Sequence, residues 1–182
     1  MKPALPALPR LRTAVGIACV VLATAASIAA QFIPRSIEEL TAEATCVVHG
    51  RVEAVEVLPG SDGAPFTRVE LAVESTWKGS STHRIVVTQA GGTLGSRRVV
   101  VSGEATYLPG EEVVVFLVAN PRGEWLTCGM TQGKFSVRRE ESQVWVAHPF
   151  IGGSPKPGGF RPAHLLPLSL ADLHKRVTAV KP

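Results

Sequence analysis

The feature that most constrains the fold of this chain is a series of short, valine-rich segments between residues 46 and 147. Valine is β-branched, and its stiff side chain suits extended strands better than helices. Turn signals separate the segments, for example Pro109-Gly110 and the run Asn120-Pro121-Arg122-Gly123. Many short strands with turn signals between them are typical of an all-β barrel or sandwich. The sequence therefore predicts one mainly β domain.

The first predicted strand, Cys46 to Leu58, changes the face that carries its apolar residues. Val52 belongs to one alternating set, whereas Val55 and Val57 belong to the other. Such a change of phase within a strand implies a bulge or a sharp bend. Gly50, just before it, would allow the backbone of a neighbour to approach closely. A bent first strand that serves two sheets is what an OB barrel requires, so the pattern favours an OB-like barrel over a plain sandwich.

The other predicted strands follow similar patterns of apolar residues. Residues 66–77 alternate between apolar and polar side chains, which predicts a half-buried strand. Residues 112–119 are apolar at both alternating sets of positions, which predicts a strand buried on both faces. The complete set of further strands is Phe66 to Trp77, Arg84 to Gln89, Arg97 to Val101, Glu112 to Ala119, Trp125 to Met130, Lys134 to Arg138 and Val144 to Ala147.

Two short helices flank the predicted strands. Ser36 and Glu39 form a capping box, with serine at the N-cap and glutamate three residues later, at the start of a helix over Ile37 to Thr45. Near the C-terminus, Ser169 precedes a second helix whose apolar residues lie on one face. We therefore expect a β domain with a short N-terminal helix and a C-terminal helix.

The first 30 residues have the three parts of a secretory signal peptide. A basic start is followed by an uncharged apolar run from Thr13, and the run ends in the small residues Ala29 and Ala30. Cleavage after either alanine fits equally well. An uncleaved anchor is an alternative because the run is roughly long enough to span a bilayer, and lipidation at Cys19 is another. The leader predicts an exported protein, periplasmic or extracellular.

Composition divides the chain into four parts. Residues 1–30 are the signal peptide, 31–148 the β domain, 149–167 an extended segment rich in Gly and Pro, and 168–182 the C-terminal helix and tail. The formal net charge of +4 falls to +1 when the three basic residues of the leader are removed. This near-neutral balance argues against nucleic acid or an anionic membrane surface as the partner, and after cleavage we expect no stable membrane span.

Residues that carry enzyme chemistry do not form a recognised motif in this sequence. The five histidines are scattered, and there is no HExxH or CxxC motif, so we predict no metal centre and no other cofactor. Glu111 and Glu112 are neighbours in a strand and point to opposite faces, which prevents them from flanking one substrate bond. His49 lies on the polar face of its strand, which predicts a solvated position.

Five short motifs occur in order along the β domain, between Val48 and Phe135. They are Val48-His49-Gly50-Arg51-Val52, Trp77-Lys78-Gly79, Gly91-Gly92, Gly110-Glu111 up to Phe116-Leu117, and Gln132-Gly133-Lys134-Phe135. In this order they resemble a group of small exported bacterial β proteins, mostly uncharacterised. The layout is also distantly similar to the netrin-like modules of metalloproteinase inhibitors, which are OB-type barrels.

The resemblance implies an OB-like (netrin-like) barrel of five strands or slightly more. Within it, the motif glycines Gly50, Gly79, Gly110 and Gly133 are expected to be structural. It also implies a protease as the partner. The netrin-like inhibitors reach the zinc of their target through an N-terminal cysteine, whereas this chain would begin at Ala30 or Gln31 after cleavage. That departure argues against inhibition by zinc chelation.

Two cysteines remain after removal of the leader, Cys46 and Cys128. An even pair in an exported chain indicates a disulfide. An OB-like strand order would also bring the first strand beside the late strand that carries Cys128. We therefore expect a Cys46–Cys128 bridge, with two buried free thiols as the alternative.

These observations favour a non-enzymatic extracytoplasmic binding module, inhibitor-like toward a secreted protease. The basis is a rigid β scaffold with Gly-rich loops, which commonly carry recognition. One alternative is a structural envelope component that binds glycan or cell-wall polymer through the tryptophans. The other is an enzyme whose site is assembled from loop residues. The residues concerned are Trp77, Trp125 and Trp145 for the glycan site, and His49, His83 and Glu104 for the enzyme.

Overall fold

The computed structural model describes residues 33–80, 82–140, 143–149 and 168–180. The predicted signal peptide lies outside the described residues, as does nearly all of the segment predicted to be extended. From Pro34 onward the chain forms one compact unit. Within the described residues, every helix is too short or too polar to cross a bilayer.

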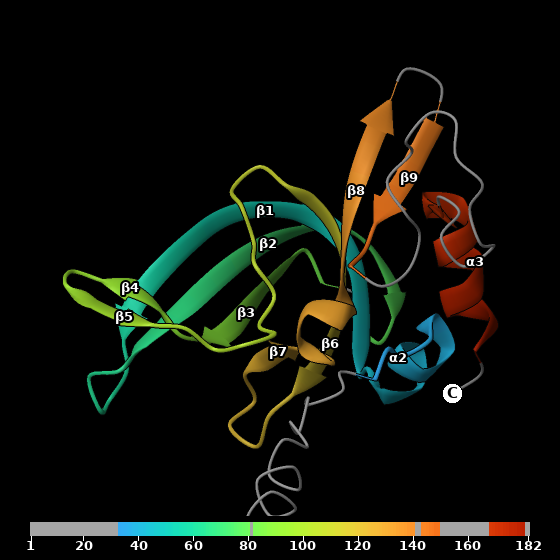
Figure 1. Ribbon diagram of the computed structural model, residues 1–182. Helices are drawn as coiled ribbons and strands as arrows, with labels where there is room; N and C mark the ends of the chain where they lie inside the picture. The colour runs from blue at the N-terminus through green and yellow to red at the C-terminus, as the bar shows by residue number, and fades with distance from the viewer. Residues whose placement is uncertain (1–32, 81, 141–142, 150–167, 181–182) are drawn as a thin grey trace, which may run out of the picture. The chain divides into compact units, whose positions relative to one another are not determined.

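Five strands close a barrel (Figure 1). Around the barrel they are, in order, β1 (Cys46–Pro59), β2 (Pro65–Lys78), β3 (Arg84–Ala90), β7 (Trp125–Thr127) and β6 (Glu112–Ala119). β6 then pairs with β1 and closes the circle. All neighbours are antiparallel except β3 and β7, which are parallel. The predicted mainly β, OB-like barrel is confirmed.

A second group of strands extends from β6. There β8 (Lys134–Glu140) pairs with β6, β9 (Gln143–Ala147) with β8, and β10 (Leu168–Ser169) with β9. A separate hairpin of β4 (Gly92–Leu94) and β5 (Arg97–Val99) follows β3. Figure 1 shows this hairpin at the far end of the β1–β2 ribbon from the helices.

The strand predicted over residues 125–130 is shorter than expected. β7 ends at Thr127, and a 3-10 turn over Met130–Gly133, η1, leads into β8. Gly129 and Met130 both adopt left-handed φ angles, 63° and 59°, which a strand cannot contain. The chain therefore leaves the edge of β6 after β7 and returns to the same edge as β8.

β1 bends so that it pairs with β2 on one side and with β6 on the other. Its pairing with β2 shifts register between Val52 and Ala54, where the change of apolar phase predicts a bulge. A second shift follows His49. There the backbones approach so closely that a Cβ on Gly50 would lie 2.2 Å from the carbonyl oxygen of Ala72. The bend thus depends on a residue without a side chain.

The other three motif glycines lie at turns and at a close approach. Gly79 and Gly110 have φ angles of +87° and +81° in the turns that follow β2 and precede β6. A Cβ on Gly133 would lie 2.1 Å from the carbonyl oxygen of Cys128. The loop between β7 and β8 therefore approaches itself too closely for a side chain at this position.

The described residues form two apolar cores, and β6 contributes to both. One core fills the barrel and includes Val113, Val115 and Leu117, all fully buried. The other lies between the outer side of the sheet and the two helices, and it includes Val114 and Phe116. The prediction that β6 is buried on both faces is therefore confirmed.

The helices α2 (Ile37–Glu43) and α3 (Leu170–Ala179) cover the outer core side by side. The capping box at the start of α2 is present, and Ser169 caps α3 by accepting a hydrogen bond from the backbone N–H of Asp172. Arg176 of α3 donates two hydrogen bonds, each 2.7 Å long, to the carboxylate of Glu38 on α2. Packing and this ion pair together position α3 over β9 and the end of β2.

The expected disulfide is wrong, because Cys46 and Cys128 are both free and buried. Cys46 lies opposite Leu117 of β6, and Leu117 lies opposite Thr127 of β7. Residues opposite one another share a face, so Cys128, one residue after Thr127, faces the other way. The cysteines are two strand spacings apart, and each spacing is about 4.8 Å. Their Cα atoms are therefore farther apart than the roughly 7 Å that a disulfide allows. Cys46 accordingly packs in the barrel core and Cys128 in the outer core.

Candidate functional site

His49 is buried, which corrects the prediction of a solvated position. Its exposed fraction is only 8 %. Nε2 lies 2.8 Å from Oε1 of Glu112, and Nδ1 lies 3.7 Å from Oε2 of Glu74. Its ring also lies 5.9 Å from that of Trp77. The alternation of polar residues in β1 marks the outer face correctly, but neighbouring side chains cover that face at this point.

Glu112 is the centre of an ion-pair network. Arg139 of β8 binds both of its carboxylate oxygens, with Nε 2.8 Å from Oε2 and Nη2 2.6 Å from Oε1. These bonds hold the pKa of Glu112 at about 2, although burial acts in the opposite direction. Arg51 of β1 adds a contact of 3.5 Å. Two arginines and a histidine thus surround one buried carboxylate.

The ligand atoms of His49, Glu74 and Glu112 all lie within 4.8 Å of one another, which is close enough for one metal ion. Imidazole and carboxylate are ligands that Zn²⁺ accepts. Both oxygens of Glu112, however, already accept hydrogen bonds from Arg139, and Arg51 lies beside them. A cation would have to displace one guanidinium group and remain next to another. The donor set therefore fits an ion-pair network better than a metal centre.

The same network leaves little scope for acid–base chemistry by His49. Each ring nitrogen faces a carboxylate, so neither is directed at a nucleophile. Ser75, its neighbour across the β1–β2 ladder, instead accepts a hydrogen bond of 2.9 Å from Nε1 of Trp77. A Ser–His pair of the kind that activates a nucleophile is not formed by these two side chains.

The three residues of the enzyme hypothesis are not brought together. His49 belongs to the network of Glu112. Glu104 instead accepts a hydrogen bond of 3.1 Å from the buried Gln89, and burial raises the pKa of Glu104. His83 is exposed in the turn between β2 and β3. The residues thus have separate surroundings.

Glu111 and Glu112 point apart, as expected for neighbours in a strand. Glu111 accepts hydrogen bonds from Lys134, at 2.7 Å, and from Ser136. Burial raises the pKa of Glu111, but these two donors outweigh it and hold the pKa below the ordinary value. Glu111 also accepts a hydrogen bond from the backbone N–H of Leu108, so it ties the preceding turn to the strand.

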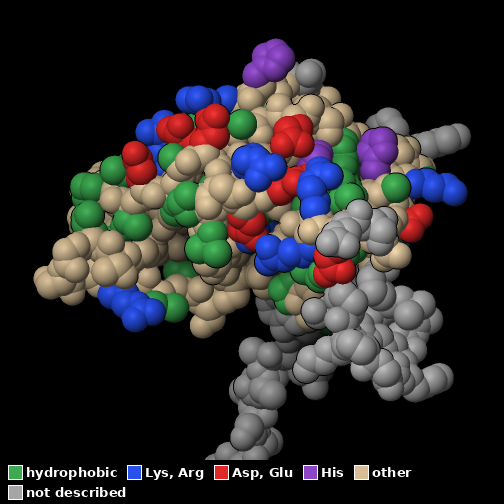
Figure 2. Space-filling view, turned by 90° about the horizontal axis from the view of Figure 1, so that it is seen from above, with side chains coloured by type: hydrophobic (Ala, Val, Ile, Leu, Met, Phe, Trp, Pro, Cys, Tyr) green, Lys and Arg blue, Asp and Glu red, His purple; other side chains and the backbone are tan. Residues whose placement is uncertain are grey.

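An open cleft of about 590 Å³ lies between the end of β2 and the start of α3, and we call it the Trp77 cleft. The rings of Trp77 and His174 have centroids 4.8 Å apart and are tilted by 58°, so they form two walls of a corner. Figure 2 shows histidine, acidic and basic side chains gathered on this side of the molecule. The cleft is lined by His49, Ser75, Thr76, Trp77, Val144, Leu170, Ala171 and His174.

The three tryptophans have different surroundings. Trp77 is half-buried in its cleft. Trp125 is half-buried and lines another depression, of about 380 Å³, beside Cys46. Trp145 is 8 % exposed. Of these three, Trp77 is the one placed beside a second aromatic side chain in a cleft of ligand size.

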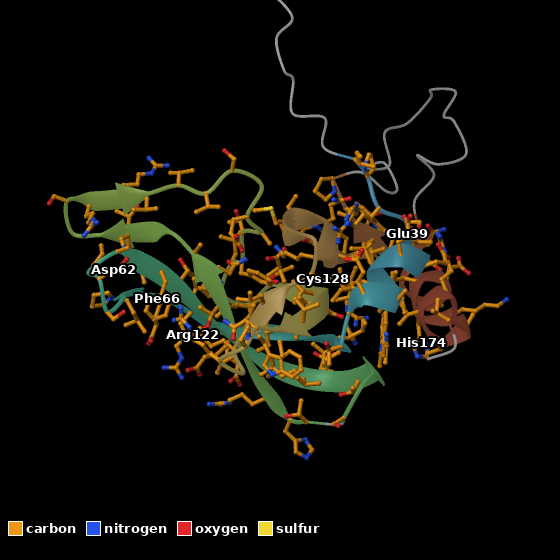
Figure 3. All side chains as sticks on the ribbon, turned by 90° about the horizontal axis from the view of Figure 1, so that it is seen from below. Glu39, Asp62, Phe66, Arg122, Cys128 and His174 are labelled. Carbon is orange, nitrogen blue, oxygen red and sulfur yellow. The ribbon has the colours of Figure 1, made fainter. Side chains whose placement is uncertain are left out.

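A groove of about 650 Å³ lies on another side of the barrel, and we call it the Phe66 groove. The turn between β1 and β2, the end of β3 and the turn between β6 and β7 all contribute to it. Phe66 is half-buried in its floor. Figure 3 shows Asp62, Phe66 and Arg122 following one another along this side. Asp62 and Arg122 are exposed, and neither forms an ion pair within the described part of the chain.

No family model and no curated protein matches this chain. The resemblances noted in the sequence therefore remain predictions.

Sequence reasoning missed both the network around Glu112 and the Phe66 groove. Arg139 reaches Glu112 diagonally across the β6–β8 ladder, and only the register between those strands determines which residues meet. The sequence did contain one usable signal for the groove. Pro59-Gly60-Ser61-Asp62-Gly63 and Asn120-Pro121-Arg122-Gly123 are turn signals beside barrel strands, and both contribute to the groove.

Proposed function

We propose that this chain is an exported, non-enzymatic binding module that holds a segment of a partner protein in the Phe66 groove. One observation carries the proposal. Turns that are about 60 residues apart in the sequence converge at one end of a closed barrel and leave a groove between them. Turns on a rigid β scaffold are where recognition commonly occurs.

The chemistry of the groove suits a protein segment. Its floor offers Phe66 and Pro65, which can bury an apolar side chain. Asp62 and Arg122 supply opposite charges for which the described residues provide no ion-pair partner. A segment with an apolar side chain between a basic and an acidic residue would complement all three features.

The location of the groove agrees with this proposal. OB-type barrels bind extended polymers over their second and third strands and between the flanking loops. The Phe66 groove includes residues of β2 and β3 and the corresponding loops. The similarity to netrin-like modules points to a secreted protease as the partner, and the leader points to a meeting outside the cytoplasm. Because the chain offers no N-terminal cysteine after cleavage, such inhibition would operate by blocking access rather than by binding zinc.

The test uses the exported full chain and two variants. The protein is immobilised and exposed to the culture supernatant and envelope fraction of its own cells, and the captured proteins are identified. Arg122→Glu reverses a charge of the groove, whereas Arg138→Glu reverses an exposed charge on β8 as a matched control. We expect one partner that Arg138→Glu retains and Arg122→Glu loses by at least tenfold. Equal capture by both variants would contradict the proposal.

A protease assay then addresses the kind of partner. The captured protein is tested for peptide hydrolysis with and without the chain at equimolar concentration. Slower hydrolysis, relieved by Arg122→Glu, would establish the inhibitor function. A partner without protease activity would leave the binding module in place and remove the inhibitor function.

A further inference from the structure

We propose that the Trp77 cleft is a second binding site, and that its ligand is a neutral pyranose sugar of an envelope or cell-wall glycan. This site is separate from the Phe66 groove and does not depend on the function proposed for it. The shape of the cleft, its mixture of apolar and polar groups, and the pairing of the charges beside it all suit such a ligand.

The walls of the cleft suit one face of a sugar ring. Trp77 and His174 present two aromatic planes at 58°, and Leu170 and Val144 continue the apolar surface. A pyranose has C–H groups gathered on one face, and these pack against an aromatic ring. The volume of about 590 Å³ is within the range of small-molecule sites and leaves room for more than one ring.

The rim of the cleft suits the hydroxyl groups of a sugar. Ser75 is exposed and lines the cleft, and its hydroxyl, which accepts a hydrogen bond from Nε1 of Trp77, can still donate one to a ligand. Glu74, next to Ser75 on β2, is 44 % exposed and faces His49 at 3.7 Å. Its carboxylate therefore retains acceptor capacity for a ligand hydroxyl. An apolar peptide side chain would fill the walls but would form no hydrogen bond with Ser75 or Glu74.

The charges beside the cleft favour a neutral ligand. Arg139 and Glu112 neutralise one another at 2.6 Å, and Arg51 lies against the same carboxylate. An anionic ligand would be repelled by the carboxylates of Glu112 and Glu74. A cationic ligand would be repelled by the guanidinium groups of Arg51 and Arg139. A neutral ligand meets neither repulsion, because its binding only replaces hydrogen bonds to water by hydrogen bonds to the rim of the cleft.

The experiment is isothermal titration of the full chain with neutral tetrasaccharides, namely β-1,4-linked oligomers of N-acetylglucosamine, of glucose and of xylose. Oligogalacturonate serves as an anionic comparison and tetralysine as a cationic one. We expect at least one neutral oligomer to bind and the two charged probes to bind at least tenfold more weakly. No binding by any neutral oligomer, or tighter binding of either charged probe, would overturn the proposal.

Variants locate the site. Trp77→Ala should weaken binding of the neutral oligomer at least tenfold, and Trp77→Phe, which keeps an aromatic wall, should recover most of it. Trp125→Phe, in a different depression, should bind as the unmodified chain does. Thermal melting of each variant shows whether the fold is retained. Binding that survives Trp77→Ala in a folded protein would overturn the assignment. Arg122→Glu should not change sugar binding, so failure of the groove proposal can be told apart from failure of this one.

Discussion

The two faces of β6 differ in the side chains that they present and in what those side chains contact. Its inner face fills the barrel with aliphatic side chains, and the buried hydroxyls of Tyr107 and Thr127 next to that core satisfy one another at 2.8 Å. Its outer face carries Glu112 in an ion-pair network at the start of the strand, and it carries Phe116 beneath the helices farther along. The inner face determines the shape of the barrel. The outer face determines where α3 lies and, with it, where the Trp77 cleft opens.

The largest effect is expected from a charge on the inner face. Val115 is fully buried in the barrel core, so Val115→Asp places a carboxylate where it has no partner. We expect a loss of about 4 kcal/mol or more in the free energy of unfolding, which would leave the protein largely unfolded. Urea denaturation followed by circular dichroism measures it. Val144→Asp, at the half-buried rim of the cleft, is the matched control and should cost within about 1 kcal/mol. Similar losses for both would show that the barrel core tolerates a buried charge as well as the half-buried wall of the cleft does.

Gly50→Val tests the bend that lets β1 serve both sheets. The new Cβ would overlap the carbonyl oxygen of Ala72 at 2.2 Å, and backbone cannot move away as a flexible side chain can. We expect a destabilisation of roughly 2 to 3 kcal/mol. Gly95→Asn is the control, because a side chain there meets nothing within 4 Å and asparagine tolerates its positive φ. An unchanged melting temperature for Gly50→Val would show that the two strands separate more easily than the geometry implies.

Glu112→Gln tests the outer network through its pH dependence. The pKa of Glu112 falls from 4.5 to about 2 in the folded protein. A lowered folded pKa stabilises the fold fully above 4.5, and this contribution is lost as the pH falls toward 2. We expect the variant to be roughly 2 kcal/mol less stable at neutral pH. The difference between the two proteins should shrink as the pH is lowered from 5 to 2. A difference that stays constant over this range would contradict the ionic role, and Glu53→Gln at an exposed pair serves as the control.

The smallest effect is expected for the cysteines, which lie on the two sides of the sheet. Alkylation of the unreduced, denatured exported protein should find both Cys46 and Cys128 as free thiols. In the folded protein the reaction should be slow, because burial raises the pKa of Cys46, and burial together with Glu43 raises the pKa of Cys128 to about 11. Addition of a reductant should leave the melting temperature unchanged. A fall in melting temperature on reduction would place the two residues closer than the strand order allows.

The barrel could be predicted from the sequence because local patterns determine it. The change of phase after Ala54 indicated the bulge in β1, and the doubly apolar run at 112–119 indicated the strand shared by both cores. The cysteine pair could not be judged in the same way. The strand order places Cys46 and Cys128 near the same end of β6. The registers of the β1–β6 and β6–β7 pairs, which the sequence does not reveal, determine the side of the sheet to which each side chain points.

The surroundings of the candidate sites were beyond the same reasoning. The polarity of His49 marked its face correctly, yet its burial depends on Trp77 and on carboxylates contributed by β2 and β6. The Trp77 cleft depends on α3, which follows β9 by more than 20 residues in the sequence. Periodicity describes single elements, and such sites arise where elements meet.

The central claim is that the outside of this barrel binds a partner protein at the Phe66 groove. Site-specific photo-cross-linking tests it most directly. A photoreactive amino acid is introduced at position 122 of the exported full chain and, as a control, at the exposed position 138 on β8. After irradiation of intact cells, the products are separated by mass and identified. We expect one discrete cross-linked protein from position 122 and none from position 138. A discrete partner from position 138 with none from position 122 would contradict it.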